Sequence, residues 1–195
     1  FCNGSLNLNS IAMLMTLDLA RSLVQKYLKN PMNQIHSRES EVVLRALARE
    51  LSEDEENWGL AGLLHDLDWE ETSEDWSQHG LKIREILEKE NLEIPAEVEQ
   101  AISAHNSDYT KVLPQTKFDY ALRVGETVTG LIYAYALMRP ERLNGMSASS
   151  LNKKFKDQKF AEKVSRNTIN EVEKLGIERS RFFEIAIEAI QEIAE

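Results

Sequence analysis

One short stretch of the chain combines an apolar helical run with side chains that bind metal ions. Residues 59–68 read GLAGLLHDLD, so His65 and Asp66 stand next to each other near its end. A neutral imidazole nitrogen beside a carboxylate oxygen is a ligand mixture that suits Zn, Mn, Fe or Ni better than Ca. Adjacent residues of a regular helix point about 100° apart, so both can face one ion only where the helix ends. Asp68 and the polar residues after it indicate that the helix ends here.

Three further histidines lie at the ends of predicted helices or on their apolar faces. His36 precedes the apolar positions of the predicted helix 34–51 by two turns on the same face. His79 lies near the start of another predicted helix, and His105 ends the apolar stripe of a helix that Pro95 opens. A single histidine in such a place is most simply a core residue with satisfied hydrogen bonds. Four of them on buried helix sides favour a shared site.

One carboxylate interrupts the broad apolar face of the longest periodic stretch, residues 116–138. If this residue, Glu126, were buried and unpaired, it would cost several kcal/mol or take up a proton, whereas a neighbouring cation would remove the penalty. Alternatively, Glu126 is exposed or forms an ion pair with Arg123, one turn earlier. Both interpretations remain open from the pattern alone.

In chain order, these residues resemble the ligand pattern of the HD-domain superfamily of metal-dependent phosphohydrolases. That pattern is a histidine, a His-Asp pair, often two further histidines and a final aspartate; here it reads His36, His65-Asp66, His79, His105 and Glu126. The similarity is greatest to a small bacterial and archaeal branch of predicted HD hydrolases, over about residues 18–194. It includes the segments 60–70 (LAGLLHDLDWE), 101–106 (AISAHN), 121–140 and 154–164 (KFKDQKFAEKV). The chain departs from the pattern in having Glu126 where the family has aspartate.

The resemblance implies one or two divalent transition-metal ions, from Mn, Fe, Ni, Co and Zn, with Mg as a further candidate. It assigns a first ion to His36, His65, Asp66 and Glu126, and a second to His79 and His105, with Asp66 bridging. The implied reaction is hydrolysis of a phosphomonoester or phosphodiester, a nucleotide among the candidates, by a metal-activated water. Asp66 would then be catalytic through the ions. Asp68 is a candidate for moving a proton between water and leaving group, and its alternative role is to cap the next turn.

Positive side chains near such a site are candidates for contacting a phosphate. Residues 153–159 (KKFKDQK) are the one local excess of positive charge, which makes Lys153 and Lys154 the first candidates. Arg123, close to Glu126 in the sequence, is a third. The alternative for the two lysines is a solvated helix face.

Two rival functions use the same ligand set. In the first, two irons activate oxygen, as in myo-inositol oxygenase and its relatives, and two irons per chain with oxygen-dependent turnover would identify it. In the second, the chain is a degenerate HD domain that binds a ligand or partner without turnover. Glu126 raises this second alternative, because its extra methylene displaces the carboxylate by roughly one C–C bond length and loosens a shared site.

The remaining pattern predicts an all-α, single-domain fold for residues 16–195, with residues 1–15 as a leader or tag-like segment outside the core. No segment shows the alternation of a sheet. A capping box at 52–55 predicts the start of the helix that carries His65, and residues 157–175 are predicted as one helix. Gly59 and Gly62 are poor helix formers, so we expect them where a neighbouring backbone approaches closely.

Composition limits the partners and the compartment. A formal net charge of −10 argues against general binding of nucleic acids, but a small phosphorylated substrate at a metal cluster stays compatible with it. No apolar run is long enough for a membrane span. The single cysteine, Cys2, cannot form an internal disulfide, which favours a cytoplasmic protein. Ligand histidines must be neutral, so we expect metal affinity to fall below about pH 6.5.

Overall fold

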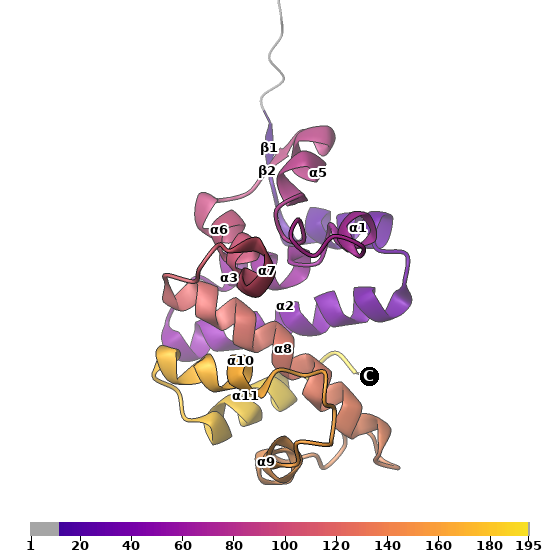
Figure 1. The fold of residues 1–195 in the computed structure, drawn as a ribbon, viewed down its shortest axis with the longest axis vertical. Helices are drawn as coiled ribbons and strands as arrows, with labels where there is room; N and C mark the ends of the chain where they lie inside the picture. Colours follow the sequence, from indigo (N-terminus) through magenta and orange to yellow (C-terminus); the bar gives the residue numbers. More distant parts are fainter. Residues whose placement is uncertain (1–11, 195) are drawn as a thin grey trace, which may run out of the picture.

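Helices make up nearly all of the regular structure in residues 12–194, the part of the chain that the computed structural model describes (Figure 1). In chain order they are α1 (Leu17–Tyr27), α2 (Pro31–Leu51), α3 (Glu55–Leu64), α4 (Trp69–Thr72), α5 (Ile83–Glu90), α6 (Ala96–His105), α7 (Ser107–Thr110), α8 (Lys117–Leu137), α9 (Ala148–Lys156), α10 (Arg166–Asn170), the 3-10 helix η1 (Glu171–Leu175) and α11 (Arg179–Gln191). The predicted all-α class is confirmed. One parallel pair was not expected: β1 (Met13–Leu14) lies beside β2 (Leu92–Glu93).

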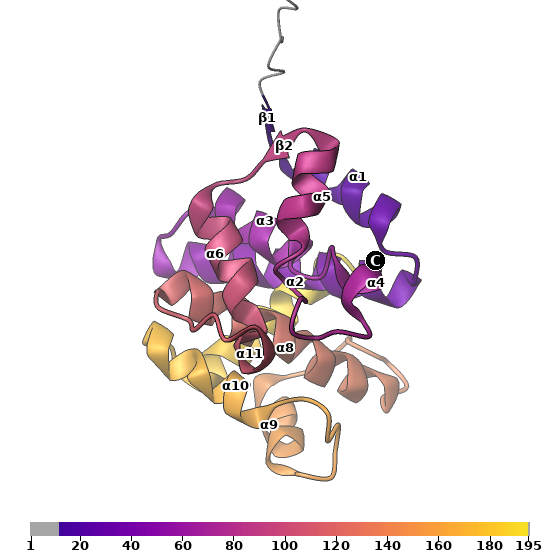
Figure 2. The ribbon, with the colours of Figure 1, turned by 45° about the horizontal axis from the view of Figure 1, so that its top comes forward.

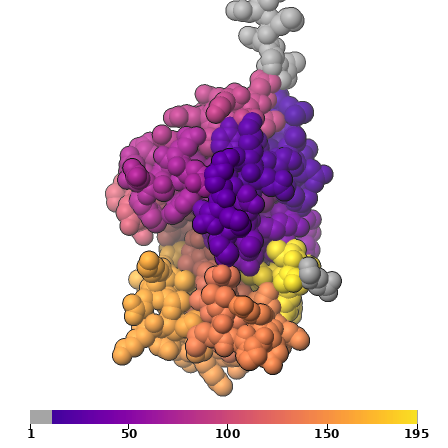
Figure 3. Space-filling view, turned by 90° about the vertical axis from the view of Figure 1, so that its right-hand side faces the viewer, coloured from indigo at the N-terminus to yellow at the C-terminus, as the bar shows by residue number. Residues whose placement is uncertain are grey.

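Two long helices, α2 and α8, cross the middle of the molecule and contact each other (Figures 1 and 2). Helix α3 packs on α2, α6 packs on both α3 and α8, and α11 packs on α2 from the other side. Seen from the side, the N-terminal segments lie directly on the C-terminal ones (Figure 3). Although α2 and α8 have 21 residues each, no helix within residues 12–194 is both long and apolar enough to cross a membrane.

The buried side chains from α1 to α11 form one connected apolar cluster. Leu44 and Leu47 of α2 are fully buried in it, as is Leu122 of α8. The cluster begins earlier than the expected boundary at residue 16, because Met15 is only 3 % exposed. Most of the expected leader, residues 1–11, lies outside the described residues.

The close approach of α2 and α3 depends on glycine at position 62, where the predicted contact with a neighbouring backbone is confirmed. A Cβ added at Gly62 would lie 2.6 Å from the Ser40 carbonyl oxygen, so a larger residue there would push the two helices apart. At Gly59 the nearest atom to an added Cβ is the Arg45 Cγ at 2.8 Å, which belongs to a side chain and not to the backbone. The contact therefore sets how near the end of α3, where His65 stands, comes to the first turns of α2.

Two local predictions are wrong. Ser52 does not begin α3: it ends α2 in the left-handed conformation, with φ of 58°, while Asp54 caps α3 by accepting from two backbone N–H groups. Residues 157–165 form turns instead of helix, and α10 begins only after its cap, Ser165. The guanidinium of Arg166 donates to backbone carbonyls throughout this turn segment, at Phe155, Asp157, Phe160, Ala161 and Val164. It thereby satisfies acceptors that a helix would have satisfied internally.

Candidate metal centre

Five segments of the fold bring the six candidate ligands together. They supply His36 from α2, His65 and Asp66 from the end of α3, His79 from the turn before α5, His105 from the last residue of α6 and Glu126 from the middle of α8. Because α3 ends at Leu64, the backbone after it no longer follows a regular helix. The adjacent pair can therefore point into one space, which was the condition set by the sequence.

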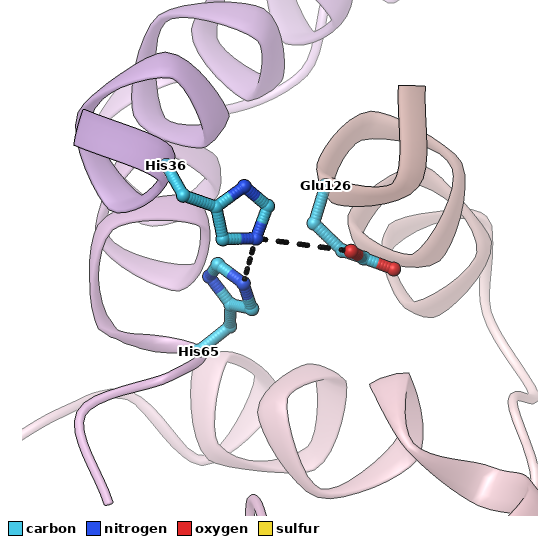
Figure 4. Close-up of side chains that lie close together, drawn as sticks. All are labelled: His36, His65 and Glu126. Carbon is cyan, nitrogen blue, oxygen red and sulfur yellow. Dashed lines mark hydrogen bonds and ion pairs between the residues drawn. The ribbon is translucent and has the colours of Figure 1, made fainter. Parts of the chain in front are cut away.

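The first group of donors joins α2, α3 and α8. One donor atom each from His36, His65 and Glu126 lies within 4.8 Å of the others. The two Nε2 atoms of the histidines are 3.1 Å apart, and Glu126 Oε2 lies 3.9 Å from His36 Nε2 (Figure 4).

The second group lies directly beside the first. It consists of Asp66, His79 and His105, whose donor atoms also lie within 4.8 Å of one another. Asp66 Oδ1 is 3.1 Å from His79 Nε2, and the Nε2 atoms of His79 and His105 are 3.3 Å apart. The other oxygen of Asp66 lies 3.7 Å from His36 Nε2 in the first group. Oδ1 of Asp66 also lies 3.4 Å from His65 Nε2 of the first group, so Asp66 stands between the two groups.

Hydrogen bonds to the protein determine which ring nitrogen faces the cluster. The Nδ1 atom of His65 lies 2.9 Å from the Gly62 carbonyl, and that of His105 lies 2.6 Å from the Ile102 carbonyl. A carbonyl only accepts, so both Nδ1 atoms carry the proton. In the neutral ring, Nε2 then presents its lone pair to the cluster.

The other two histidines are oriented in the same way by side chains. His36 Nδ1 lies 2.8 Å from the Thr129 hydroxyl, which gives its own proton to the Glu126 carbonyl and so accepts from His36. His79 Nδ1 lies 2.8 Å from a carboxylate oxygen of Asp68. Ligand histidines in proteins almost always have such a partner behind them, which holds the ring and its tautomer.

The arrangement of nitrogens fits bound cations. Two pairs of Nε2 atoms face each other at 3.1 and 3.3 Å, with the Nδ1 protons all committed to other acceptors. In the His36–His65 pair, neutral rings oppose lone pair to lone pair, and a divalent ion between the donors would remove that repulsion. Imidazole nitrogens with carboxylate oxygens are ligands for Mn, Fe, Co, Ni or Zn. We conclude that the residues present fit one or two such ions.

Comparison with protein families now adds to this geometry. The family model described as HD domain matches residues 34–148, which is more than half of the chain and includes all six candidate ligands. The chain belongs to the HD domain family. Such domains are often metal-dependent phosphohydrolases that act on small phosphorylated substrates. Searches of curated proteins and of solved structures found no match.

The pKa values in this HD domain show where protons compete with metal ions. Burial lowers the pKa of His36 to about 4 and that of His105 to about 3, so both are neutral at pH 7. Burial acts the same way on His79, but the carboxylates of Asp66 and Asp68 outweigh it and raise its pKa to about 9. Without ions, His79 therefore holds a proton at neutral pH.

The pKa values of the two carboxylates in the cluster are shifted in opposite directions. Burial raises the pKa of Glu126 to about 8, and the nearby negative charge of Asp66 adds to the effect. Burial acts to raise the pKa of Asp66 as well, but the surrounding histidines, His65 foremost, hold it far below its usual range. Asp66 is therefore ionised at every physiological pH, while Glu126 gains from a cation beside it.

Asp68 does not have the place expected of a proton carrier. It is 1 % exposed, and its Oδ1 accepts from His79 Nδ1 while its Oδ2 accepts from the backbone N–H groups of Gly80 and Lys82, at 2.8 and 3.1 Å. It lies behind His79 and not at the cluster, and its side chain makes no cap for α4. Asp68 is placed to orient a ligand and to fix the turn that carries it.

Arg123 is also committed elsewhere. Its guanidinium forms a two-pronged ion pair with Glu171, at 2.7 and 3.0 Å, and donates to the His105 carbonyl and the Ser107 hydroxyl. It does not pair with Glu126, as the sequence alternative had it. The residue is 6 % exposed and joins α8 to η1 and to the end of α6. These bonds hold the segment that carries His105, and Arg123 also lines the cavity over the cluster, so its contact with a substrate stays a prediction.

A cavity of about 460 Å³ opens over the cluster, with His36, His105 and Glu126 in its lining. The predicted phosphate contacts Lys153 and Lys154 do not line it: Lys153 is exposed on α9, and Lys154 Nζ lies over the Tyr135 and Phe160 rings. The lysine in the lining is Lys163, an exposed residue of the turn segment before α10.

Sequence reasoning missed three prominent lining residues, Lys163, Trp76 and Tyr109. Lys163 lies in segment 154–164, whose only signal is its similarity to the HD hydrolases, and helical periodicity predicts a helix there. Trp76 and Tyr109 stand in polar stretches without periodicity, so no pattern pointed to them. Both rings are identified as part of the cavity wall only by their exposed position in the fold.

Proposed function

We propose that this HD domain hydrolyses a phosphomonoester or phosphodiester at a centre of two divalent metal ions. The observation that carries the proposal is the convergence of four histidines, each with Nδ1 occupied from behind, on two donor groups that share Asp66. The cluster also borders an open cavity of a size that holds small ligands. Its ligands are His36, His65 and Glu126 for one ion, and His79 and His105 for the other, with Asp66 between them.

Hydrolysis adds water across the bond between phosphorus and the leaving oxygen. The water oxygen bonds to phosphorus, the old P–O bond breaks, and the leaving oxygen gains a proton. Divalent ions, when bound, lower the pKa of the attacking water and neutralise charge on the phosphoryl oxygens.

The protein contributes position and charge to this reaction. His36 and Glu126 face the cavity, so the phosphoryl group enters from their side. Lys163 lines the same cavity, and its ammonium group meets the phosphate oxygens. Asp68 holds His79 in place and is a positioning residue. Because Asp68 does not line the cavity, solvent supplies the proton that the leaving oxygen gains.

The test is a matrix of metals and substrates on purified protein. After loading with Mn, Co, Ni or Mg, we expect release of phosphate from a monoester or of the leaving alcohol from a diester, and loss of both metal and activity in His65→Ala/Asp66→Ala. Lys163→Ala should raise KM without changing metal content, whereas Lys153→Ala, on the exposed face of α9, should leave both unchanged.

Three outcomes oppose the proposal. Metal retained at full stoichiometry by the double variant would show that the cluster is not the metal site. Two irons per chain with oxygen-dependent turnover of an organic substrate would identify an oxygenase. Metal binding with no hydrolysis of any monoester or diester above the double-variant background, over the whole matrix, would identify a binding domain.

A further inference from the structure

Two exposed aromatic rings form one wall of the cavity over the metal cluster. Trp76 lies in the turn segment after α4 and Tyr109 in α7, and both line the cavity that contains His36 and Glu126. Their ring centroids are 5.4 Å apart and the planes meet at 43°. Trp76 is 44 % and Tyr109 54 % exposed, so a large apolar area faces water at this wall.

The wall is fixed relative to the metal ligands. The Trp76 carbonyl accepts from the Asn106 amide at 2.8 Å, which ties the turn segment to the residue after His105. Trp69 packs edge-on against both the Trp76 ring and the His79 ring, with centroids 5.4 and 5.2 Å away. The Trp76 ring itself is 6.4 Å from that of His79. A phosphoester held at the cluster therefore has its organic group within reach of the aromatic wall.

We infer that the cavity selects phosphoesters whose organic group carries a planar ring, which stacks on Trp76 and Tyr109. This inference rests on the proposed phosphohydrolase function. Aromatic faces bind planar rings of any identity, because each has a π-face and removes apolar surface from water. A substrate without a ring would leave the wall hydrated and would lose this contribution.

Charge around the cavity sets the orientation of the substrate. Asp108, also in the lining, precedes Tyr109 in α7, whereas the two cations of the lining come from other segments, Arg123 from α8 and Lys163 from the turn segment before α10. An anionic group beside Asp108 would be repelled. The ring end should therefore be neutral or carry hydrogen-bond donors, and the phosphate belongs at the cluster. Nucleoside monophosphates and aryl phosphates share this chemistry.

The experiment compares esters that differ only in the ring. The probes are the four common ribonucleoside 5′-monophosphates and phenyl phosphate, against ribose 5-phosphate, which has the same sugar and phosphate but no base. With metal-loaded wild type, we expect kcat/KM for the best ring-bearing ester to exceed that for ribose 5-phosphate at least tenfold.

The aromatic variants locate this preference. Trp76→Ala/Tyr109→Ala should reduce kcat/KM for the ring-bearing ester by about 10- to 100-fold, in line with the energy of stacking on one or two aromatic side chains. It should change the value for ribose 5-phosphate less than threefold. The single variant Trp76→Phe should keep most of the wild-type kcat/KM for the ring-bearing ester, because phenylalanine still offers a ring face. Tyr133→Ala removes another partly exposed tyrosine, which is absent from the cavity lining, and should have no effect.

A binding measurement separates failure of this inference from failure of the proposed function. If no ester is hydrolysed, calorimetric titration of the metal-loaded protein with the same probes still compares ring-bearing and ring-free ligands. Tighter binding of a nucleoside monophosphate that is lost in the double variant would support the ring subsite without hydrolysis. Equal kcat/KM, or equal affinity, for ribose 5-phosphate and every ring-bearing probe would overturn it, as would a double variant that loses both kinds of ester equally.

Discussion

Replacing Asp68 by asparagine tests whether a residue outside the cluster controls the metal site. The two oxygens of Asp68 receive three hydrogen bonds of 2.8 to 3.1 Å, from His79 Nδ1 and from the N–H groups of Gly80 and Lys82, and a longer one from the Thr72 hydroxyl. An asparagine can keep its oxygen toward the imidazole, but its NH₂ group then faces two backbone donors. The Gly80 N–H loses its acceptor in a place where Asp68 is 1 % exposed, whereas the Lys82 N–H keeps the Gln78 carbonyl at 3.3 Å.

The size of the effect follows from these contacts. A buried donor left without a partner costs about 1–3 kcal/mol, so loss of the acceptor of Gly80 should lower the free energy of unfolding by about that amount. For a chain of this length that corresponds to a fall in Tm of roughly 2–12 °C. Loss of the partner behind a ligand histidine typically weakens metal binding by about 10- to 100-fold. Asp68→Asn should show both effects.

The assay combines thermal unfolding with competition against a chromogenic chelator for Mn or Zn. Glu53→Gln serves as the control, because Glu53 is exposed in the loop between α2 and α3 and its neutralisation changes the net charge equally. A metal affinity of Asp68→Asn within twofold of wild type would refute the reasoning. Asp68 would then be a residue that stabilises only the turn, and His79 would not depend on it.

Three further predictions concern the cluster and the backbone around it. Glu126→Asp should keep part of the metal affinity while Glu126→Gln, equal in shape but without charge, loses much more; equal affinity of Glu126→Gln and wild type would remove it from the ligands. Gly62→Ala places a Cβ 2.6 Å from the Ser40 carbonyl and should cost about 1–3 kcal/mol of stability and weaken metal binding. In the control Gly130→Ala the new Cβ meets only one side-chain atom, at 3.4 Å, so this variant should be neutral or stabilise by up to about 1 kcal/mol. The reverse order of the two variants in thermal unfolding would contradict this. Metal ions should displace the protons of His79, with a pKa of about 9, and of Glu126, with a pKa of about 8, so metal affinity should rise with pH up to about 9 and then level off. Calorimetry in two buffers should detect proton release on metal binding at pH 7. A metal affinity that is flat above pH 6.5 would show that these protons are not displaced.

The pKa values of the histidines in the fold predict another pH range of metal binding than ordinary histidine pKa values do. Ordinary histidine pKa values place the loss of affinity below about pH 6.5. In the fold, His36 and His105 stay neutral to far lower pH, while His79 keeps its proton to about pH 9. The expected direction is unchanged, because protons and metal ions compete for the same nitrogens. The range differs because burial and neighbouring charges act on each ring separately.

The types and the order of the candidate ligands were readable from the sequence. Helical periodicity placed His36 and His105 on apolar faces and showed that Glu126 interrupts one, and the glycine at 62 indicated the close approach of a neighbouring backbone. These signals are local: a helix repeats every 3.6 residues whatever lies beside it, and apolar residues must be on its inner face. For the same reason the all-α class could be predicted, while the two-residue pair of β1 and β2, which joins segments nearly 80 residues apart, could not.

Only the tertiary structure decided what the charged side chains around the cluster do. Arg123 and Glu171 are 48 positions apart, and they form an ion pair at the cavity that Arg123 also lines. Asp68 reaches His79 because the intervening turns fold back, and Lys163 reaches the cavity because Arg166 holds its segment out of a helix. A long, flexible or acidic side chain has many potential partners at similar energies. Which partner it meets depends on the packing of distant segments, and that packing is absent from any local pattern.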